Sequence, residues 1–500
     1  MIASRLLLTE AAHSGDHIIP FDLDSAFLNA EIDRTVLVSL PEIWQDDKEK
    51  IVKLKKALHG LKEAPRAWFK KYGRGLVSLG WVECKSAPGL WRKPSKTRPG
   101  KFLKVSVYVD DNLITGPDKE EIANELNSIF GLFPGQIIDM KETVDEAGAK
   151  WLSLDFLGAD VHYSSDARSM RVDMSTYIAK QMKRFNFNLT SPVYSPNYDE
   201  ARVAKTEGVE TYPDFPSRSV VGALQWVTTV ARPDVTVPVN TLAKYVANTP
   251  TKSFTKAAKK IFKYLATTPQ IGVSYSPDAE NKFNKIYSEL LPKNKPIPPI
   301  NLFSDASFAN CLKTMRSTSG SIIYYRGTPI AWKTQRQGVR AYSTAESEYI
   351  ASSDTIALSE TSDFLDFYRP IPSRVLEESF GLTPEGDDAI LWVDNQSAIT
   401  ISKSDELKPK SRHYALRYLR VKDYAEKIVF CPTHLQKADA LTKLTASVPQ
   451  RELLLHHVQN PCLKVTKDSE ALEDDVSSDE EIPSYADFKL SRPKKKRKTQ

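Results

Sequence analysis

The chain has 500 residues, 41% of them apolar and 26% charged, which is typical of a folded globular protein with about two to four domains. No run approaches about 18 apolar residues and the N-terminus carries no signal pattern, so the sequence argues against a membrane-inserted or secreted protein. Four widely spaced cysteines indicate reduced thiols and no disulfide framework or zinc site. The net charge of +6 excludes little by itself.

The first candidate site lies near the N-terminus. Residues 18–31 begin as an apolar strand and continue into a helix-compatible stretch, which places Asp22 at a strand end, where metal ligands are common. Residues 102–116 contain two strand-like runs with Asp110 and Asp111 between them. Adjacent carboxylates repel each other and are costly to desolvate, and a bound divalent cation would remove that cost. Because turns favour Asp, an ordinary turn is the alternative interpretation.

These segments resemble the reverse transcriptase of copia-type LTR retrotransposon Pol polyproteins. The similarity rests on Phe21-Asp22 with Ala26 to Asn29, on LKKALHGLKEAPRAWF at 54–69, and on the YVDD sequence at 108–111. By this resemblance Asp22, Asp110 and Asp111 are the palm carboxylates, and they hold two Mg²⁺ or Mn²⁺ ions that activate the primer 3′-hydroxyl and neutralise the triphosphate.

The resemblance also assigns two nucleotide-binding positions. Phe27 fits the family's aromatic steric gate against a ribose 2′-hydroxyl, with a packed core phenylalanine as the alternative. Glu63 stands where the family usually has Gln, and a carboxylate there would repel phosphate unless it is paired or protonated. Family members carry a basic fingers motif upstream, and this sequence begins after it. We therefore expect an N-terminally truncated region, with defective polymerisation as the alternative.

The middle of the chain continues the resemblance and contains a predicted helix. Segments 151–163, 175–187 and 217–246 resemble the family's later palm and its thumb and connection. In the stretch before residue 292, Phe254, Ala258, Ile261, Phe262 and Leu265 recur at helical spacing, while four lysines from 256 to 263 lie largely away from that stripe. Residues 292–299 contain four prolines and are predicted to form a linker.

A second set of acidic residues follows the linker. A strand is expected to end at Asp305, a strand pair to turn at Gly327, and a helix over 341–360 to carry Glu346 and Glu348 in its first turns. Asp394 ends another buried strand, and Asp439 lies near a helix start. Each acid alone is an ordinary strand-end or helix-cap residue.

Together these segments resemble the ribonuclease H domain of the same family. By that match Asp305, Glu348, Asp394 and Asp439 hold two divalent ions for RNA cleavage, and Glu348 is preferred to Glu346 because it precedes an apolar residue and a nearby Ala. The resemblance gives His413 a structural or substrate-contact role. His434 is interpreted as an incidental surface residue, with a proton shuttle as the alternative.

The last 33 residues change character. Acidic residues dominate from Asp468 to Glu481, and a basic run closes the chain. Such blocks cannot form a core and are predicted to be disordered. The basic run suits capture by a nuclear import receptor, with a solvated tail as the alternative, and consists of Lys494, Lys495, Lys496, Arg497 and Lys498.

The expected architecture is an α+β palm with partial fingers (1–190), a helical thumb and connection (191–291), a linker (292–299), an α/β ribonuclease H domain on a mixed five-stranded sheet (300–460) and a tail (461–500). The expected function is DNA synthesis on RNA coupled to degradation of RNA in hybrids, in a cytoplasmic particle and the nucleus. The implied partners are an RNA template, a DNA primer, the hybrid and deoxynucleoside triphosphates. The alternative is a fragment that retains only ribonuclease H activity or nucleic-acid binding.

Overall fold

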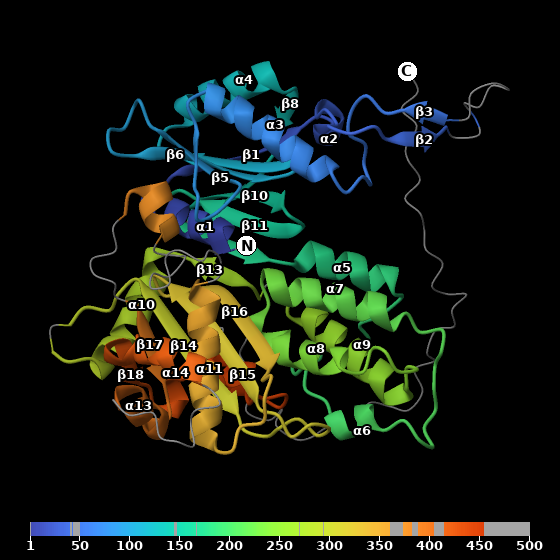
Figure 1. Cartoon of the computed structure of the whole chain (residues 1–500), viewed down its shortest axis with the longest axis vertical. Helices are drawn as coiled ribbons and strands as arrows, with labels where there is room; N and C mark the ends of the chain where they lie inside the picture. Colours follow the sequence, from blue (N-terminus) through green and yellow to red (C-terminus); the bar gives the residue numbers. More distant parts are fainter. Residues whose placement is uncertain are drawn as a thin grey trace. The chain divides into compact units, whose positions relative to one another are not determined.

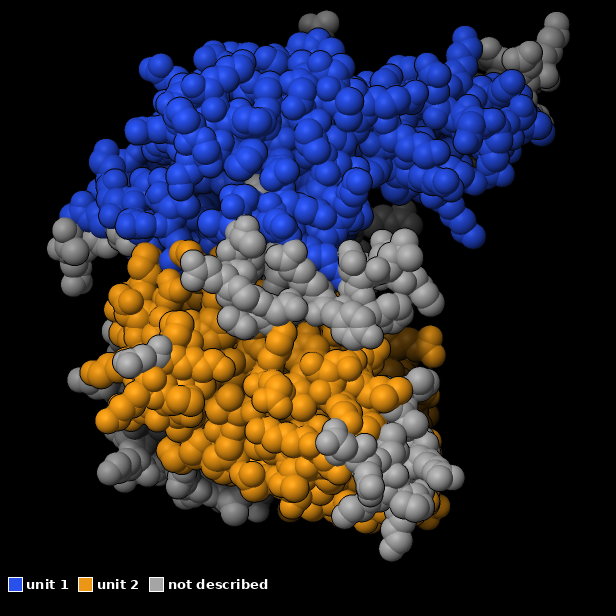
Figure 2. Space-filling view, turned by 60° about the vertical axis from the view of Figure 1, so that its left-hand side comes forward, with its two compact units in different colours: residues 1–157, 162–170, 362–387 blue, residues 158–161, 171–361, 388–500 orange. Residues whose placement is uncertain are grey.

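The structure is a computed structural model. It describes residues 2–40, 43, 51–144, 148–166, 168–269, 271–293, 295–360, 374–382, 389–404 and 415–454. The chain divides into two compact units, coloured separately in Figure 2. Unit 1 comprises residues 1–157, 162–170 and 362–387, and unit 2 comprises residues 158–161, 171–361 and 388–500.

Unit 1 is built on a six-stranded antiparallel sheet with the order β4-β5-β6-β7-β1-β8. Strands β2 and β3 form a separate antiparallel pair, and β9 pairs with β10. The elements in chain order are α1 (Ile2–Ser14), β1 (His17–Leu23), α2 (Ala26–Asn29), β2 (Leu37–Ser39), β3 (Ile51–Lys53), α3 (Ala64–Ser78), β4 (Val82–Glu83), β5 (Leu90–Pro94), β6 (Phe102–Tyr108), β7 (Asp111–Gly116), α4 (Lys119–Leu132), β8 (Gly135–Ile137), β9 (Lys141–Val144) and β10 (Lys150–Phe156).

Helices α3 and α4 lie on one face of this sheet (Figure 1). They bury an aromatic cluster in which Trp68 stacks on Tyr72 at 5.3 Å between ring centroids, while Phe133 meets both rings edge-on. Pro65 opens α3, where its missing N–H is harmless, and the Asp118 side chain caps α4 by accepting from the Glu121 amide. This packing fixes α3 against the strands that carry the first candidate site.

The first part of unit 2 is mainly helical. Helix α9 confirms the predicted apolar stripe, since all five stripe residues are buried. Lys263, one of the four lysines predicted to lie largely away from the stripe, is buried as well, with its Nζ 3.5 Å from the Thr190 hydroxyl. The elements from the boundary onward are β11 (Ala159–Ser164), β12 (Ser169–Asp173), α5 (Ser175–Arg184), α6 (Glu200–Ala204), α7 (Ser217–Val230), η2 (Pro233–Val235), α8 (Thr236–Ala243), α9 (Lys252–Thr267), β13 (Val273–Tyr275), α10 (Pro277–Tyr287) and η3 (Ser288–Leu290).

The rest of unit 2 contains a five-stranded mixed sheet with the order β16-β15-β14-β17-β18. Strands β14 to β16 are antiparallel neighbours, and β14, β17 and β18 run parallel. Helix α11 packs on β14 and β15 (Figure 1). The elements are β14 (Ile300–Ser307), β15 (Thr318–Tyr325), β16 (Thr328–Arg336), α11 (Thr344–Glu360), β17 (Ile390–Val393), α13 (Gln396–Lys403), α14 (Ala415–Lys422), η6 (Ala425–Lys427), β18 (Ile428–Phe430), η7 (Thr433–Leu435), η8 (Asp439–Leu441) and α15 (Val448–Leu454), with η4 (Leu376–Phe380) assigned to unit 1.

The α+β class with several sheets is therefore confirmed, and the sheet that follows residue 299 is five-stranded and mixed. One strand end was wrong: β14 continues past Asp305 to Ser307, because Ala306 and Ser307 still pair with β15. Residues 292–299 fall inside unit 2, between η3 and β14, so the predicted domain boundaries stay predictions. None of the described helices is both long enough and apolar enough to span a membrane.

Candidate active site

The first acidic site is built on the β6–β7 hairpin of unit 1. Tyr108 pairs with Asp111, which leaves Val109 and Asp110 as a two-residue turn. Val109 adopts a left-handed backbone conformation with φ 62°, which is costly for a β-branched residue. Its carbonyl accepts a 2.8 Å hydrogen bond from the Trp68 indole of helix α3, so the helix holds the strained turn in place.

Strand β1 brings Asp22 to this hairpin. Asp22 and Asp111 are direct partners in the antiparallel β1–β7 register. Partial burial raises the pKa of Asp22, and the charge of Asp110 raises it further. The pKa of Asp111 is also raised, first by burial and then by the charges of Asp110, Asp22 and Asp155. The three predicted carboxylates therefore act on one another, and a cation placed among them would relieve that repulsion.

The other predicted residues of this site have identifiable surroundings. Phe27 is half-buried and meets the His59 ring edge-on, with the centroids 5.1 Å apart. Glu63 forms an ion pair with Arg34 at 2.5 Å. Its own backbone amide and the Arg34 guanidinium lower the pKa of Glu63, so this carboxylate is charged and paired. The pairing condition stated for Glu63 is thus met by Arg34, which sequence reasoning did not identify.

The second acidic site lies in unit 2, where three elements converge. Asp305 projects from β14, Glu348 from the second turn of α11, and Asp394 directly follows β17. One carboxylate oxygen from each lies within 4.8 Å of the other two. Asp305 and Glu348 are buried and Asp394 is half-buried. Oxygen ligands at this spacing suit a hard divalent cation, so the triad could hold a metal ion.

The raised pKa values of the triad carboxyls also fit a site that could hold a metal ion. Burial raises the pKa of both Asp305 and Glu348, and the charges of neighbouring carboxylates add to the effect. Burial also raises the pKa of Asp394, although a 3.3 Å hydrogen bond from Thr433 opposes the shift. Glu348 Oε2 is buried without a hydrogen-bond partner among the described residues. A buried oxygen without a hydrogen-bond partner beside two other carboxylates fits the binding of a divalent cation.

Asp439, the fourth predicted ligand, lies beside the triad but is not part of it. It opens η8 and is 2% exposed. Lys443 donates to its Oδ1 and Gln450 donates to its Oδ2. The neighbouring Thr442 hydroxyl contacts Asp305 Oδ2 at 2.5 Å. The structure therefore brings together three of the four predicted carboxylates and engages the fourth with two other side chains.

Several contacts at this site were not foreseen. Thr442, Lys443, Gln450 and Thr433 all contact predicted carboxylates. Thr442 and Lys443 belong to the same short segment as Asp439, and that proximity was the available signal. Nothing in the local sequence marks Gln450, because it comes from the next helix.

The remaining candidates do not enter the triad. Glu346 accepts a 2.8 Å hydrogen bond from the Tyr342 amide at the start of α11, and Glu348 is the acid of this helix that lies in the triad. His434 is exposed in η7. His413 and the basic residues 494–498 lie outside the described residues.

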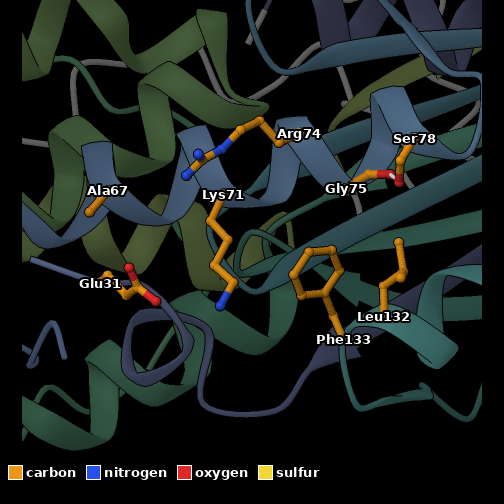
Figure 3. A pocket seen from close by; sticks show the side chains of 8 residues that line it. All are labelled: Glu31, Ala67, Lys71, Arg74, Gly75, Ser78, Leu132 and Phe133. Carbon is orange, nitrogen blue, oxygen red and sulfur yellow. Dashed lines mark hydrogen bonds between the residues drawn. The ribbon is translucent and has the colours of Figure 1, made fainter. Parts of the chain in front are cut away.

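A separate pocket of about 480 Å³ opens between α3 and the end of α4. Figure 3 shows Lys71 extending from α3 on the side of Phe133, with Glu31 nearby. None of the predicted site residues lines this pocket, so it is distinct from both acidic sites.

Comparison with known proteins covers most of the chain. Residues 2–199 match a family described as reverse transcriptase (RNA-dependent DNA polymerase). The Retrovirus-related Pol polyprotein from transposon TNT 1-94 of Nicotiana tabacum is 26% identical over 456 residues, which are 89% of this chain and 31% of that polyprotein. The corresponding polyprotein from transposon RE1 of Arabidopsis thaliana is 27% identical over 451 residues, 88% of this chain and 27% of its own length.

A shorter relative has a different extent. The putative transposon Ty5-1 protein of Saccharomyces cerevisiae is 23% identical over 341 residues, which cover 67% of this chain and 99% of that protein. This chain thus spans less than a third of the two plant polyproteins but nearly all of the yeast protein.

Proposed function

Because the chain carries a reverse transcriptase region of the kind found in copia-type retrotransposon Pol polyproteins, we propose that it is an RNA-directed DNA polymerase that also cleaves RNA in RNA–DNA hybrids. The observation that carries the second activity is the meeting of Asp305, Glu348 and Asp394 from three separate elements. The polymerase activity is supported by the family match and by the pairing of Asp22 with Asp111.

In this proposal the β6–β7 hairpin is the polymerase centre. Asp22, Asp110 and Asp111 would hold divalent cations, which when bound supply charge neutralisation for the triphosphate and the primer 3′-oxygen. The Trp68 bond to Val109 keeps the hairpin tip fixed while substrates exchange. Phe27 selects deoxynucleotides, because its ring would collide with a ribose 2′-hydroxyl. Arg34 shields incoming phosphates from the charge of Glu63.

The triad in unit 2 is the proposed ribonuclease centre. Asp305, Glu348 and Asp394 would hold Mg²⁺ or Mn²⁺, and a bound ion supplies activation of water and stabilisation of the departing 3′-oxygen. The protein supplies three carboxylates fixed by β14, α11 and the end of β17. Asp439 joins them as a fourth ligand. Discrimination of hybrids from DNA duplexes depends on the RNA 2′-hydroxyls.

The layout and partners form part of the same proposal. Residues 1–190 act as palm and partial fingers, 191–291 as thumb and connection, and 300–460 as the ribonuclease H domain. The partners are template, primer, hybrid and deoxynucleoside triphosphates, and their binding weakens steeply with salt because it rests on phosphate contacts. The basic run 494–498 directs the chain to the nucleus through an import receptor.

The test uses purified full-length chain with Mg²⁺ and a DNA primer annealed to a labelled RNA template. Asp111→Asn should abolish primer extension and leave RNA loss intact, whereas Asp394→Asn should do the reverse. Asp278→Asn, which removes an exposed carboxylate of α10, is the matched control and should change neither activity.

Extension that survives Asp111→Asn would refute the polymerase centre, and RNA loss that survives Asp394→Asn would refute the ribonuclease centre. If the unaltered chain degrades RNA but never extends a primer, the function reduces to ribonuclease H.

A further inference from the structure

The contacts of Asp439 differ from those of the triad beside it. Both Asp439 oxygens accept hydrogen bonds, one from Lys443 and one from Gln450, and the residue is almost fully buried. Glu348 in the triad instead keeps one buried oxygen without a partner among the described residues. Three carboxylates of the acidic site therefore face one another, whereas the fourth, Asp439, already accepts hydrogen bonds at both oxygens.

Lys443 acts on more than its direct partner. Its ammonium contacts Asp439 Oδ1, and its charge also reaches Asp305 and Asp394. Its positive charge therefore offsets part of the repulsion among these acids. Its side chain is 42% exposed, against 3% for Asp439, so the lysine can swing into solvent without disturbing buried packing.

The backbone around this pair is firmly anchored, so a change of partner would involve side chains alone. Lys437 donates a 2.8 Å hydrogen bond to the Leu453 carbonyl of α15, and Thr334 of β16 donates one of 2.7 Å to the Leu441 carbonyl. Thr442 bonds both the Asp439 carbonyl and the Asp305 carboxylate. Asp439 is thus held at a fixed place next to the triad.

We propose that Lys443 is a positioning residue whose ammonium occupies the place of the second of two divalent ions. The ammonium holds Asp439 until that second ion displaces it. This inference rests on the proposed ribonuclease function and adds an order of binding to it. The first ion enters the triad of Asp305, Glu348 and Asp394. The second ion is bound more weakly because it must compete with Lys443, and Gln450 keeps Asp439 oriented while the exchange occurs.

The experiment is Mn²⁺ titration of the full-length chain by calorimetry, with the bound ions counted by electron paramagnetic resonance. The variant is Lys443→Met, which keeps the length of the side chain and removes its charge. Lys282→Met is the matched control, because Lys282 forms the same i,i+4 pair with Asp278 on exposed helix α10. Asp305→Asn identifies ions bound at the triad, since it should remove the tighter class.

Lys443→Met should tighten the weaker class of Mn²⁺ binding, beside Asp439, by about tenfold or more, the size of effect typical for groups around a metal site. It should lower the melting temperature in EDTA, and saturating Mn²⁺ should abolish that deficit. Lys282→Met should alter neither quantity. If the unaltered chain binds two ions and the affinity of the weaker class is the same in Lys443→Met, this inference is overturned while the ribonuclease proposal stands. Failure of the unaltered chain to bind any ion sensitive to Asp305→Asn would overturn the ribonuclease proposal as well.

If Lys443→Met does not fold, Gln450→Leu provides the second measurement. It leaves the lysine charge in place and frees one Asp439 oxygen, so the weaker class should weaken or stay equal. Tightening in Gln450→Leu would contradict the assignment of the competing role to Lys443.

Discussion

Glu348 and Asp305 are buried carboxyl groups that face each other and Asp394. Few side chains are so costly to bury in charged form, and the fold places these two beside a third, half-buried carboxylate. Their stability effects can therefore be measured separately from any catalytic role.

The pH dependence of stability should report this burial. Burial raises the pKa of Asp305 in the folded protein, whereas in the unfolded chain an aspartate titrates near about 4. Between the unfolded and the folded pKa the native state binds more protons than the unfolded state, so the free energy of unfolding falls as pH rises through that window. Urea titrations in EDTA at several pH values measure the free energy of unfolding of the unaltered chain and of Asp305→Asn. This free energy should fall less with rising pH in the variant.

Added Mn²⁺ should reverse the decline, because an ion that binds only the folded state stabilises it. Equal pH dependence in the two proteins would mean that Asp305 is not held in a raised-pKa environment.

The buried ion pair of Arg232 and Asp234 should contribute to stability and not to either activity. Arg232 and Asp234 are fully buried, form a two-bond ion pair at 2.9 and 2.8 Å, and are completed by the Tyr264 hydroxyl and the Thr268 carbonyl. Asp234→Asn would leave the guanidinium without a counter-ion and should reduce the free energy of unfolding by about 3–5 kcal/mol.

The measurement is urea unfolding, with Asp199→Asn as an exposed control, because the ion pair of Asp199 with Arg202 is solvated and should contribute less than about 1 kcal/mol. If Asp234→Asn lowers the free energy of unfolding by less than this control value, the surroundings of Arg232 adjust to the loss of its counter-ion.

At the scale of elements, η8 reaches the triad only because β15 carries a glycine opposite Asp305. A Cβ added at Gly320 would lie 2.7 Å from Thr442 Cγ2 and 2.8 Å from the Ala438 carbonyl oxygen. Such contacts force the backbone of η8 to move, since one of the atoms belongs to the main chain. The segment that carries Asp439 and Thr442 would shift with it.

Gly320→Ala should therefore weaken Mn²⁺ binding and lower the melting temperature. Gly222→Ala is the control, because Gly222 lies in α7 with nothing within 4 Å of an added Cβ, and it should stabilise the helix by about 0.5–1 kcal/mol. Intact Mn²⁺ affinity in Gly320→Ala would indicate that η8 has room to adjust.

Elements were the level that local sequence predicted best. Alternation specifies the hairpin over 102–116, and a glycine in the left-handed region specifies the turn at Gly327. The helix predicted over 341–360 from a run without proline or glycine begins three residues later, at Thr344. The end of β14 was missed, because continuation of a strand depends on a neighbour that the local pattern does not reveal.

At the scale of the whole molecule, the two units carry one acidic site each. Unit 1 includes residues 362–387 although the chain before and after them belongs to unit 2, and the predicted domain boundaries stay predictions. The proline-rich segment 292–299 lies within a single unit. Proline content predicted an interruption of regular structure, and it could not predict which elements pack together.

The basic run at the C-terminus makes a prediction for the whole chain in cells. Replacement of Lys494, Lys495, Lys496, Arg497 and Lys498 by alanine should move a fluorescent fusion of the chain from the nucleus to the cytoplasm, because an acidic receptor groove needs those charges. Replacement of Lys282 and Lys285 of α10 is the control and should leave the distribution unchanged. Nuclear accumulation without the basic run would refute this targeting role.

The sequence by itself determined which acidic residues are candidate metal ligands, in what order they occur, and which polymerase family the chain resembles. Only the tertiary structure decided that Asp305, Glu348 and Asp394 meet within 4.8 Å, that Arg34 neutralises Glu63, and that Asp439 is held by Lys443 and Gln450. The physical reason is that these contacts join residues from different elements. Their distances are set by sheet register, helix packing and close approach at Gly320, which no local pattern encodes.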